Sequence, residues 1–131
     1  MIMQGAESLG YSKKILERAR EPHNKGKLKG TIVETGENYV CGDTITVYVK
    51  LNGQQIEEFK FDGEGCIICL GCADLLVEKL RDMKISEILK LDDKNINGLF
   101  ETNIMNSRVK CANLALRTTK HALRSNIKEI Q

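Results

Sequence analysis

The fold of this chain is decided by residues 41–66, which read CGDTITVYVKLNGQQIEEFKFDGEGC. From residue 44 to residue 51, apolar and polar residues alternate, which is the pattern of a β-strand with one buried face. Asn52-Gly53 follows at once, and this pair is a strong signal for a β-hairpin turn because both residues tolerate positive φ. Residues 56–62 are the expected return strand, although their apolar side chains do not all fall on one face.

Segments with helical periodicity lie on both sides of this hairpin. Apolar residues recur at helical spacing over residues 11–20 and 66–83, and a long helix is predicted over residues 106–127. Ser86 is a suitable N-cap for a short helix that follows it. A further strand is expected to begin near Thr31. Strands grouped before most of the helices favour an α+β fold, with a three-stranded antiparallel sheet covered by a layer of helices.

Length and composition exclude several classes of protein. The 131 residues suit one domain, 1–131, in which residues 1–10 are expected to be a flexible tail. A net charge of +2 is too small to indicate nucleic-acid binding, and no apolar run is long enough to cross a membrane. The first residues lack the basic start and apolar run of a secretory signal, so we expect a cytoplasmic protein.

Five cysteines in a reducing compartment indicate free thiols or metal ligands rather than disulfides. Cys41 lies at the entry to the alternating strand, Cys66 follows a glycine-flanked turn and begins a predicted helix, and Cys111 lies early in the last helix. At a helix N-terminus Cys66 would meet unpaired backbone N–H groups that favour its thiolate. Dispersed cysteines also occur as small buried hydrophobic residues, so spacing alone leaves both interpretations open.

Asp43 is the candidate fourth ligand, because it follows Cys41 by two residues and shares its strand face if the strand is regular. Three soft thiolates select zinc, iron or an iron–sulfur cluster. A hard carboxylate is a poor fourth ligand for a cluster iron, for which four thiolates are usual. Such a site should release what it holds, which suits a carrier better than an electron-transfer protein.

A tighter pattern, Cys66-x-x-Cys69-x-x-Cys72, resembles part of a ferredoxin motif, but the fourth cysteine followed by proline is missing. We interpret Cys69 and Cys72 as packing residues, with the alternative that one of them is a spare sulfur acceptor. His23, in a loop, and His121, late in the last predicted helix, are not expected to bind metal.

Five short motifs occur in the order, and at nearly the spacing, found in one known family. They are Pro22-His23-Asn24-Lys25-Gly26, Cys41-Gly42-Asp43, Asn52-Gly53, Gly63-Glu64-Gly65-Cys66 and Arg108-Val109-Lys110-Cys111. Through them the chain resembles the U-type iron–sulfur cluster assembly scaffolds, the family of IscU, SufU and the N-terminal domain of NifU. The similarity extends over residues 11–123.

The resemblance implies a SufE/NifU-like fold and a scaffold or carrier rather than an enzyme. Such scaffolds receive sulfur as persulfide from a cysteine desulfurase, combine it with iron, and pass a labile cluster, usually [2Fe–2S], to apo-proteins. By motif, the implied ligands for the iron of the cluster, or for zinc, are Cys41, Cys66 and Cys111. Asp43 is then the acidic residue that keeps the site labile or acts as a ligand. The oligomeric state stays open between a monomer and a homo-oligomer that shares a cluster.

The subtype within the family also stays open. Lys110 stands where IscU-type members have histidine, and residues 105–110 lack their Leu-Pro-Pro-Val-Lys chaperone-binding motif. The spacing from Cys66 to Cys111 leaves no room for the insertion of SufU-type members. The alternative function is a zinc-dependent persulfide acceptor, in which one cysteine, expected to be Cys111, leaves the metal to take sulfur. A third alternative is an electron-transfer or structural cluster protein that uses the tighter cysteine pattern.

Overall fold

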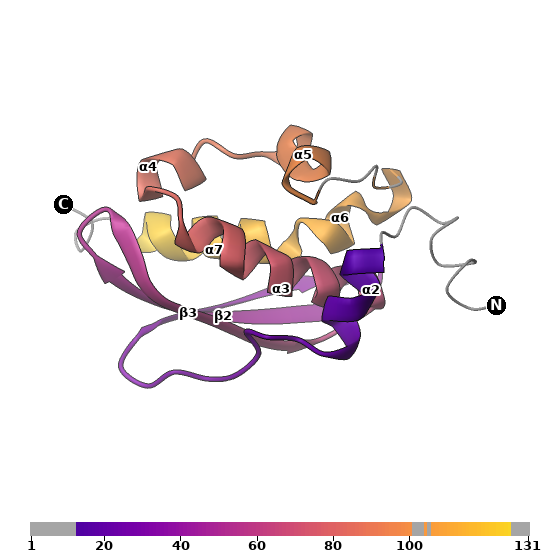
Figure 1. Ribbon diagram of the computed structural model, residues 1–131, viewed down its shortest axis with the longest axis horizontal. Helices are drawn as coiled ribbons and strands as arrows, with labels where there is room; N and C mark the ends of the chain where they lie inside the picture. The colour runs from indigo at the N-terminus through magenta and orange to yellow at the C-terminus, as the bar shows by residue number, and fades with distance from the viewer. Residues whose placement is uncertain (1–12, 101–103, 105, 127–131) are drawn as a thin grey trace.

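The computed structural model describes residues 13–100, 104 and 106–126. In this part of the chain a three-stranded antiparallel sheet, in the order β1-β2-β3, lies against a layer of helices (Figure 1). The predicted α+β architecture is thus confirmed, whereas the predicted tail lies outside the described residues. None of the described helices is long and apolar enough to cross a membrane.

The elements follow one another in the order helix, sheet, helices. The strands are β1 (Ile32–Asn38), β2 (Asp43–Asn52) and β3 (Gln55–Glu64). The helices are α2 (Lys13–Arg20), α3 (Ile67–Arg81), α4 (Ile85–Ile88), α5 (Ile96–Phe100), α6 (Val109–Ala112) and α7 (Leu114–Ser125), with short 3₁₀ helices η1 (Asp93–Asn95) and η2 (Asn106–Arg108). Helices α3 and α7 lie across one face of the sheet, and α4 and α5 lie farther from it (Figure 1).

A β-bulge explains the irregular apolar pattern of β3. The turn at Asn52-Gly53 joins β2 to β3, with Gly53 at a φ of +62°. The register then shifts between Lys50 and Leu51, which leaves Glu57 as the extra residue on β3. One extra residue reverses the alternation of side chains. Apolar residues on both sides of the bulge therefore face the helices and are buried: Ile56, Phe59 and Phe61.

Helix α3 lies between the sheet and α2, and most of its side chains are buried. Cys69 and Cys72 belong to this core, which agrees with their interpretation as packing residues. Burial raises the pKa of both thiols, so they remain neutral at physiological pH. Gly71 allows α2 to approach closely, because a Cβ atom there would lie 2.3 Å from the carbonyl oxygen of Ile15.

Helix α4 begins earlier than predicted, so the assignment of Ser86 as its N-cap is wrong. The N-cap is Lys84, whose backbone N–H donates to Glu87 Oε1 at 2.9 Å. Ile85 is buried in the core, and its N–H donates to the carbonyl oxygen of Gln54 at 2.9 Å. Packing of Ile85 against the core and its bond to the hairpin turn thus set the start of the helix.

The single long helix predicted over residues 106–127 is also wrong, because the chain is interrupted at Asn113. This residue has φ −99° and ψ 2°, between α6 and α7. Its buried amide donates to a carboxylate oxygen of Asp93 and accepts a hydrogen bond from Arg117 Nε at 3.0 Å. A tertiary bond to Asp93 and a local bond from Arg117 therefore hold Asn113 outside the helical pattern, and Cys111 lies on the short helix α6 that results.

We predict that Gly71→Ala lowers the free energy of unfolding by about 1–3 kcal/mol, because the added methyl group must push α2 away from α3. The matched control is Gly98→Ala in α5, where a Cβ atom meets open space. That substitution should leave stability unchanged or raise it by about 0.5–1 kcal/mol. Urea unfolding of both variants measures the difference. Equal stability of the two would contradict the close packing of α2 on α3.

Candidate metal centre

Three segments that are distant in sequence meet at one end of the sheet: the turn before β2, the start of α3 and helix α6. β1 ends at Asn38 and β2 begins at Asp43, and residues 39–42 form the turn between them. Cys41 lies in this turn and not on the strand, so the expectation that it shares a strand face with Asp43 is wrong. Gly42 has a φ of +72°, which the turn requires. The turn nevertheless brings the side chains of Cys41 and Asp43 together.

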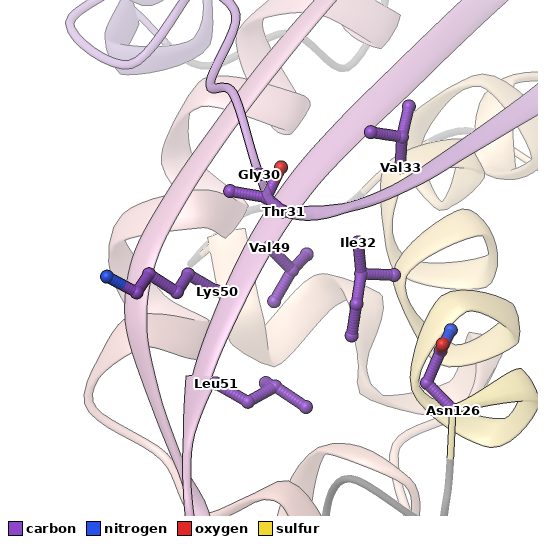
Figure 2. Close-up of a pocket in the computed structure, with 8 residues that line it drawn as sticks. All are labelled: Gly30, Thr31, Ile32, Val33, Val49, Lys50, Leu51 and Asn126. Carbon is purple, nitrogen blue, oxygen red and sulfur yellow. The ribbon is translucent and has the colours of Figure 1, made fainter.

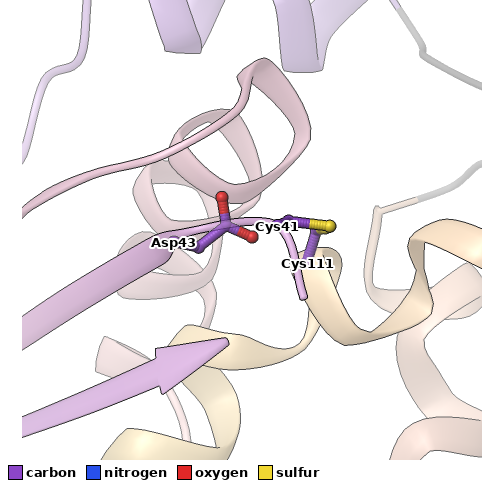
Figure 3. A group of neighbouring side chains, drawn as sticks. All are labelled: Cys41, Asp43 and Cys111. Atoms are coloured by element: carbon purple, nitrogen blue, oxygen red, sulfur yellow. The ribbon is translucent and has the colours of Figure 1, made fainter. Parts of the chain in front are cut away.

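Cys41, Asp43 and Cys111 form a group whose ligand atoms all lie within 4.8 Å of one another (Figure 3). The two sulfur atoms are 3.3 Å apart, and the carboxylate of Asp43 lies beside them at the start of β2. Zinc–sulfur bonds of about 2.3 Å place the ligands of a tetrahedral ion about 3.8 Å apart. The spacing and the sulfur-rich chemistry of this group therefore fit zinc or iron.

Cys66 adjoins this group through its backbone. It is the N-cap of α3, and its Sγ accepts a hydrogen bond from the N–H of Cys69 at 3.4 Å. Its own N–H donates to Asp43 Oδ1 at 2.9 Å. The structure thus gathers the side chains of three of the four predicted residues, while the sulfur of Cys66 caps its own helix.

Asp43 is buried, at 1% exposure, and both of its oxygen atoms accept hydrogen bonds. Oδ1 is held by the N–H of Cys66, and Oδ2 accepts from Asn38 Nδ2 at 3.1 Å. Gly65 leaves the room that the carboxylate needs, because a Cβ atom there would lie 2.6 Å from Oδ1. Neither Asn38 nor Gly65 stood out in the sequence as a site residue. The pairing of Asn38 with Asp43 across the strands is the signal that could have revealed the first.

The two thiols of the group differ in their surroundings. Cys41 is exposed, whereas Cys111 is 1% exposed. Burial raises the pKa of the Cys111 thiol, and hydrogen bonding to Cys41 and Asp43 raises it further. Without a metal, Cys111 is therefore a neutral thiol, and an incoming metal must displace its proton. Tyr39 and Val40, in the same turn as Cys41, are exposed apolar residues at 87% and 84%.

Both histidines lie away from this group. His23 is exposed and sits 3.6 Å from a carboxylate oxygen of Glu78, and His121 is 2.8 Å from one of Glu34. Neither histidine belongs to the metal-ligand group, and their lack of metal binding stays a prediction.

A separate hollow of about 440 Å³ lies near the opposite end of β1 (Figure 2). Among the described residues that line it, Lys50 is the only ionisable one, so these residues lack the thiolates, imidazoles and carboxylates that bind zinc or iron. The full lining is Gly30, Thr31, Ile32, Val33, Val49, Lys50, Leu51 and Asn126.

Comparison with known proteins shows the family of this chain. Residues 10–130 match the family model described as the NifU-like N terminal domain. The iron–sulfur cluster assembly scaffold protein IscU of Thermotoga maritima is 33% identical, with 87% of this chain and 92% of the relative covered. The zinc-dependent sulfurtransferase SufU of Bacillus subtilis is 30% identical, with 80% and 83% covered.

Similarity of structure bears on the fold. The N-terminal part of a NifU-like protein from Brucella abortus superposes with a TM-score of 0.76 at 18% identity, with 91% of this chain and 95% of that chain covered, which shows a shared fold. The resemblance carried by the five sequence motifs is thus confirmed. The chain belongs to the family of the NifU-like N-terminal domain, that of the IscU and SufU proteins of iron–sulfur cluster assembly.

Proposed function

We propose that this protein is an iron–sulfur cluster assembly scaffold. It receives sulfur from a cysteine desulfurase, assembles a labile cluster of the [2Fe–2S] type, and transfers it to apo-proteins. The observation that carries the proposal is the convergence of Cys41 and Asp43, near the start of β2, with Cys111 from a distant segment of the chain. The relative from T. maritima, whose name describes it as a scaffold, supports the same activity.

Each of the four proposed ligands has a distinct part. Cys41 and Cys111 offer adjacent sulfurs for iron, and Asp43 offers a hard oxygen. Cys66 joins them when its side chain rotates so that the sulfur points away from α3. This rotation breaks the hydrogen bond from the N–H of Cys69 and costs about 1 kcal/mol of stability. The loss is small beside metal–thiolate binding, which contributes about 10–16 kcal/mol in structural zinc sites.

Lability follows from the character of two of these ligands. A carboxylate is a weaker ligand for cluster iron than a thiolate. Cys41 lies on an exposed turn, where acceptor thiols and water reach the cargo most easily. A cluster held this way is stable enough to form and weakly enough bound to be passed on.

A zinc-dependent sulfurtransferase is the alternative function, supported by the B. subtilis relative named as one. The sequence favours Cys111 as the sulfur acceptor, but its burial makes Cys41 the better candidate. The thiolate of Cys41 attacks the outer sulfur of a desulfurase persulfide and forms a new S–S bond. The original S–S bond breaks, and the desulfurase thiolate leaves.

We predict that Cys41→Ser, Cys66→Ser and Cys111→Ser each abolish or strongly weaken cluster assembly. Cys69→Ala and Cys72→Ala, which alter core thiols, should assemble a cluster as the wild type does. The measurement is anaerobic reconstitution with iron and sulfide, followed by visible absorbance and iron and sulfide content. Loss of the cluster in Cys69→Ala or Cys72→Ala would point to the ferredoxin-like pattern instead. Zinc-loaded protein that accelerates a desulfurase but never holds a cluster would favour the sulfurtransferase.

The raised pKa of Cys111 predicts that metal affinity increases with pH. The free thiol keeps its proton through neutral pH, and binding releases it, so each unit of pH strengthens binding about tenfold per proton released. The slope of log Kd for Zn²⁺ against pH is negative, and its magnitude should fall by about one in Cys111→Ser and stay unchanged in Cys72→Ala. Competition with a chromophoric chelator from pH 6 to 8.5 measures both slopes. Equal slopes in all three proteins would exclude Cys111 as a thiolate ligand.

A further inference from the structure

A single buried amide links the carboxylate and one thiol of the site. Asn38, at 5% exposure, places Nδ2 3.1 Å from Asp43 Oδ2 and 3.5 Å from Cys111 Sγ. An asparagine amide nitrogen carries two hydrogens, so one side chain serves both acceptors. Because Asn38 and Asp43 are paired across β1 and β2, the strand register fixes the amide at this point.

We infer that Asn38 is a positioning residue for the metal or cluster, one that sets where Asp43 and Cys111 present their ligand atoms. The inference rests on the proposed function, and it names a residue outside the set of four ligands. Asn38 acts through its two neighbours and need not touch the metal.

The hydrogen bonds of Asp43 give the physical reason. Its Oδ1 is held by the backbone of Cys66 and its Oδ2 by Asn38, so both oxygen atoms have a defined place before a metal arrives. When the thiol of Cys111 becomes a thiolate ligand, two negative groups lie side by side in a buried site. The N–H groups of Asn38 point at both and offset their repulsion, which is strong where water is excluded.

The alternative is that Asn38 only satisfies buried acceptors and contributes to folding. Asn24 offers a matched control, because it is also buried, at 6% exposure, and also bonds to a buried aspartate. Its Nδ2 lies 3.2 Å from the carbonyl oxygen of Asp74 and 3.3 Å from Asp74 Oδ1. Asp74 also pairs with Arg18 and does not belong to the metal-ligand group.

The test is Co²⁺ binding to the full chain, read by the thiolate-to-cobalt charge-transfer band and by Kd. Asn38→Ala should weaken Co²⁺ binding about 10–100-fold and shift the band, because both ligands lose their orienting donor. Asn38→Ser, which keeps one donor, should give an intermediate Kd. Asn24→Ala should lose thermal stability while it keeps the wild-type Kd and band.

A wild-type Kd and band in Asn38→Ala would overturn the inference while leaving the proposed function intact. If Asn38→Ala does not fold, Asn38→Ser takes its place, and a wild-type Kd and band in that variant would overturn the inference equally. If Asn24→Ala weakened Co²⁺ binding as much as Asn38→Ala does, the effect would come from lower stability in general. That result would also overturn the inference. Wild-type protein that gives no charge-transfer band would instead contradict the proposed function itself.

Discussion

A buried carboxylate holds the functional end of this protein together. Ionised oxygen atoms removed from water must be hydrogen-bonded, or the fold loses several kcal/mol. Asp43 obtains its bonds from the end of β1, through Asn38, and from the start of α3, through the N–H of Cys66. This single side chain therefore fixes the turn at residues 39–42 relative to Cys66, the residue that precedes α3.

Two thiols in different surroundings lie beside that carboxylate. Cys41, on the turn, faces solvent, whereas Cys111, on α6, is buried and neutral until a metal displaces its proton. The sheet and helix α3 support the other residues of the site, because Asp43 begins β2 and Cys66 is the N-cap of α3. An assembly site needs this combination, because cargo must be held in a defined geometry and yet remain reachable by a partner.

Much of the fold could be predicted from local pattern, and the site could be predicted only through motifs. The alternation in β2 and the Asn52-Gly53 turn specify the hairpin because both signals are local. The bulge at Glu57 was not predicted, since a bulge is read from cross-strand pairing. The start of α4 ahead of Ser86 and the break at Asn113 were missed for a related reason: bonds that start α4 and interrupt the last helix come from distant segments. The helical pattern of the sequence does not indicate these bonds.

The site shows the same division between local and tertiary signals. Cysteines at the ends of three segments indicated candidate ligands. The position of Asn38, however, follows from the strand register, and the need for glycine at position 65 follows from the close approach of Asp43. The direction of the Cys66 sulfur depends on which donor it accepts a hydrogen bond from. In the structure it accepts from the N–H of Cys69, which the sequence pattern cannot reveal.

We propose that three sulfurs and one oxygen converge on a single metal, with the Cys66 sulfur leaving its position as helix cap to join the other ligands. X-ray absorption spectroscopy of the zinc-loaded protein counts these ligands directly. We expect three sulfur atoms and one oxygen atom around zinc in the wild type, and two sulfur atoms in Cys66→Ser. A wild-type site with only two sulfurs, unchanged by Cys66→Ser, would rule out this ligand set.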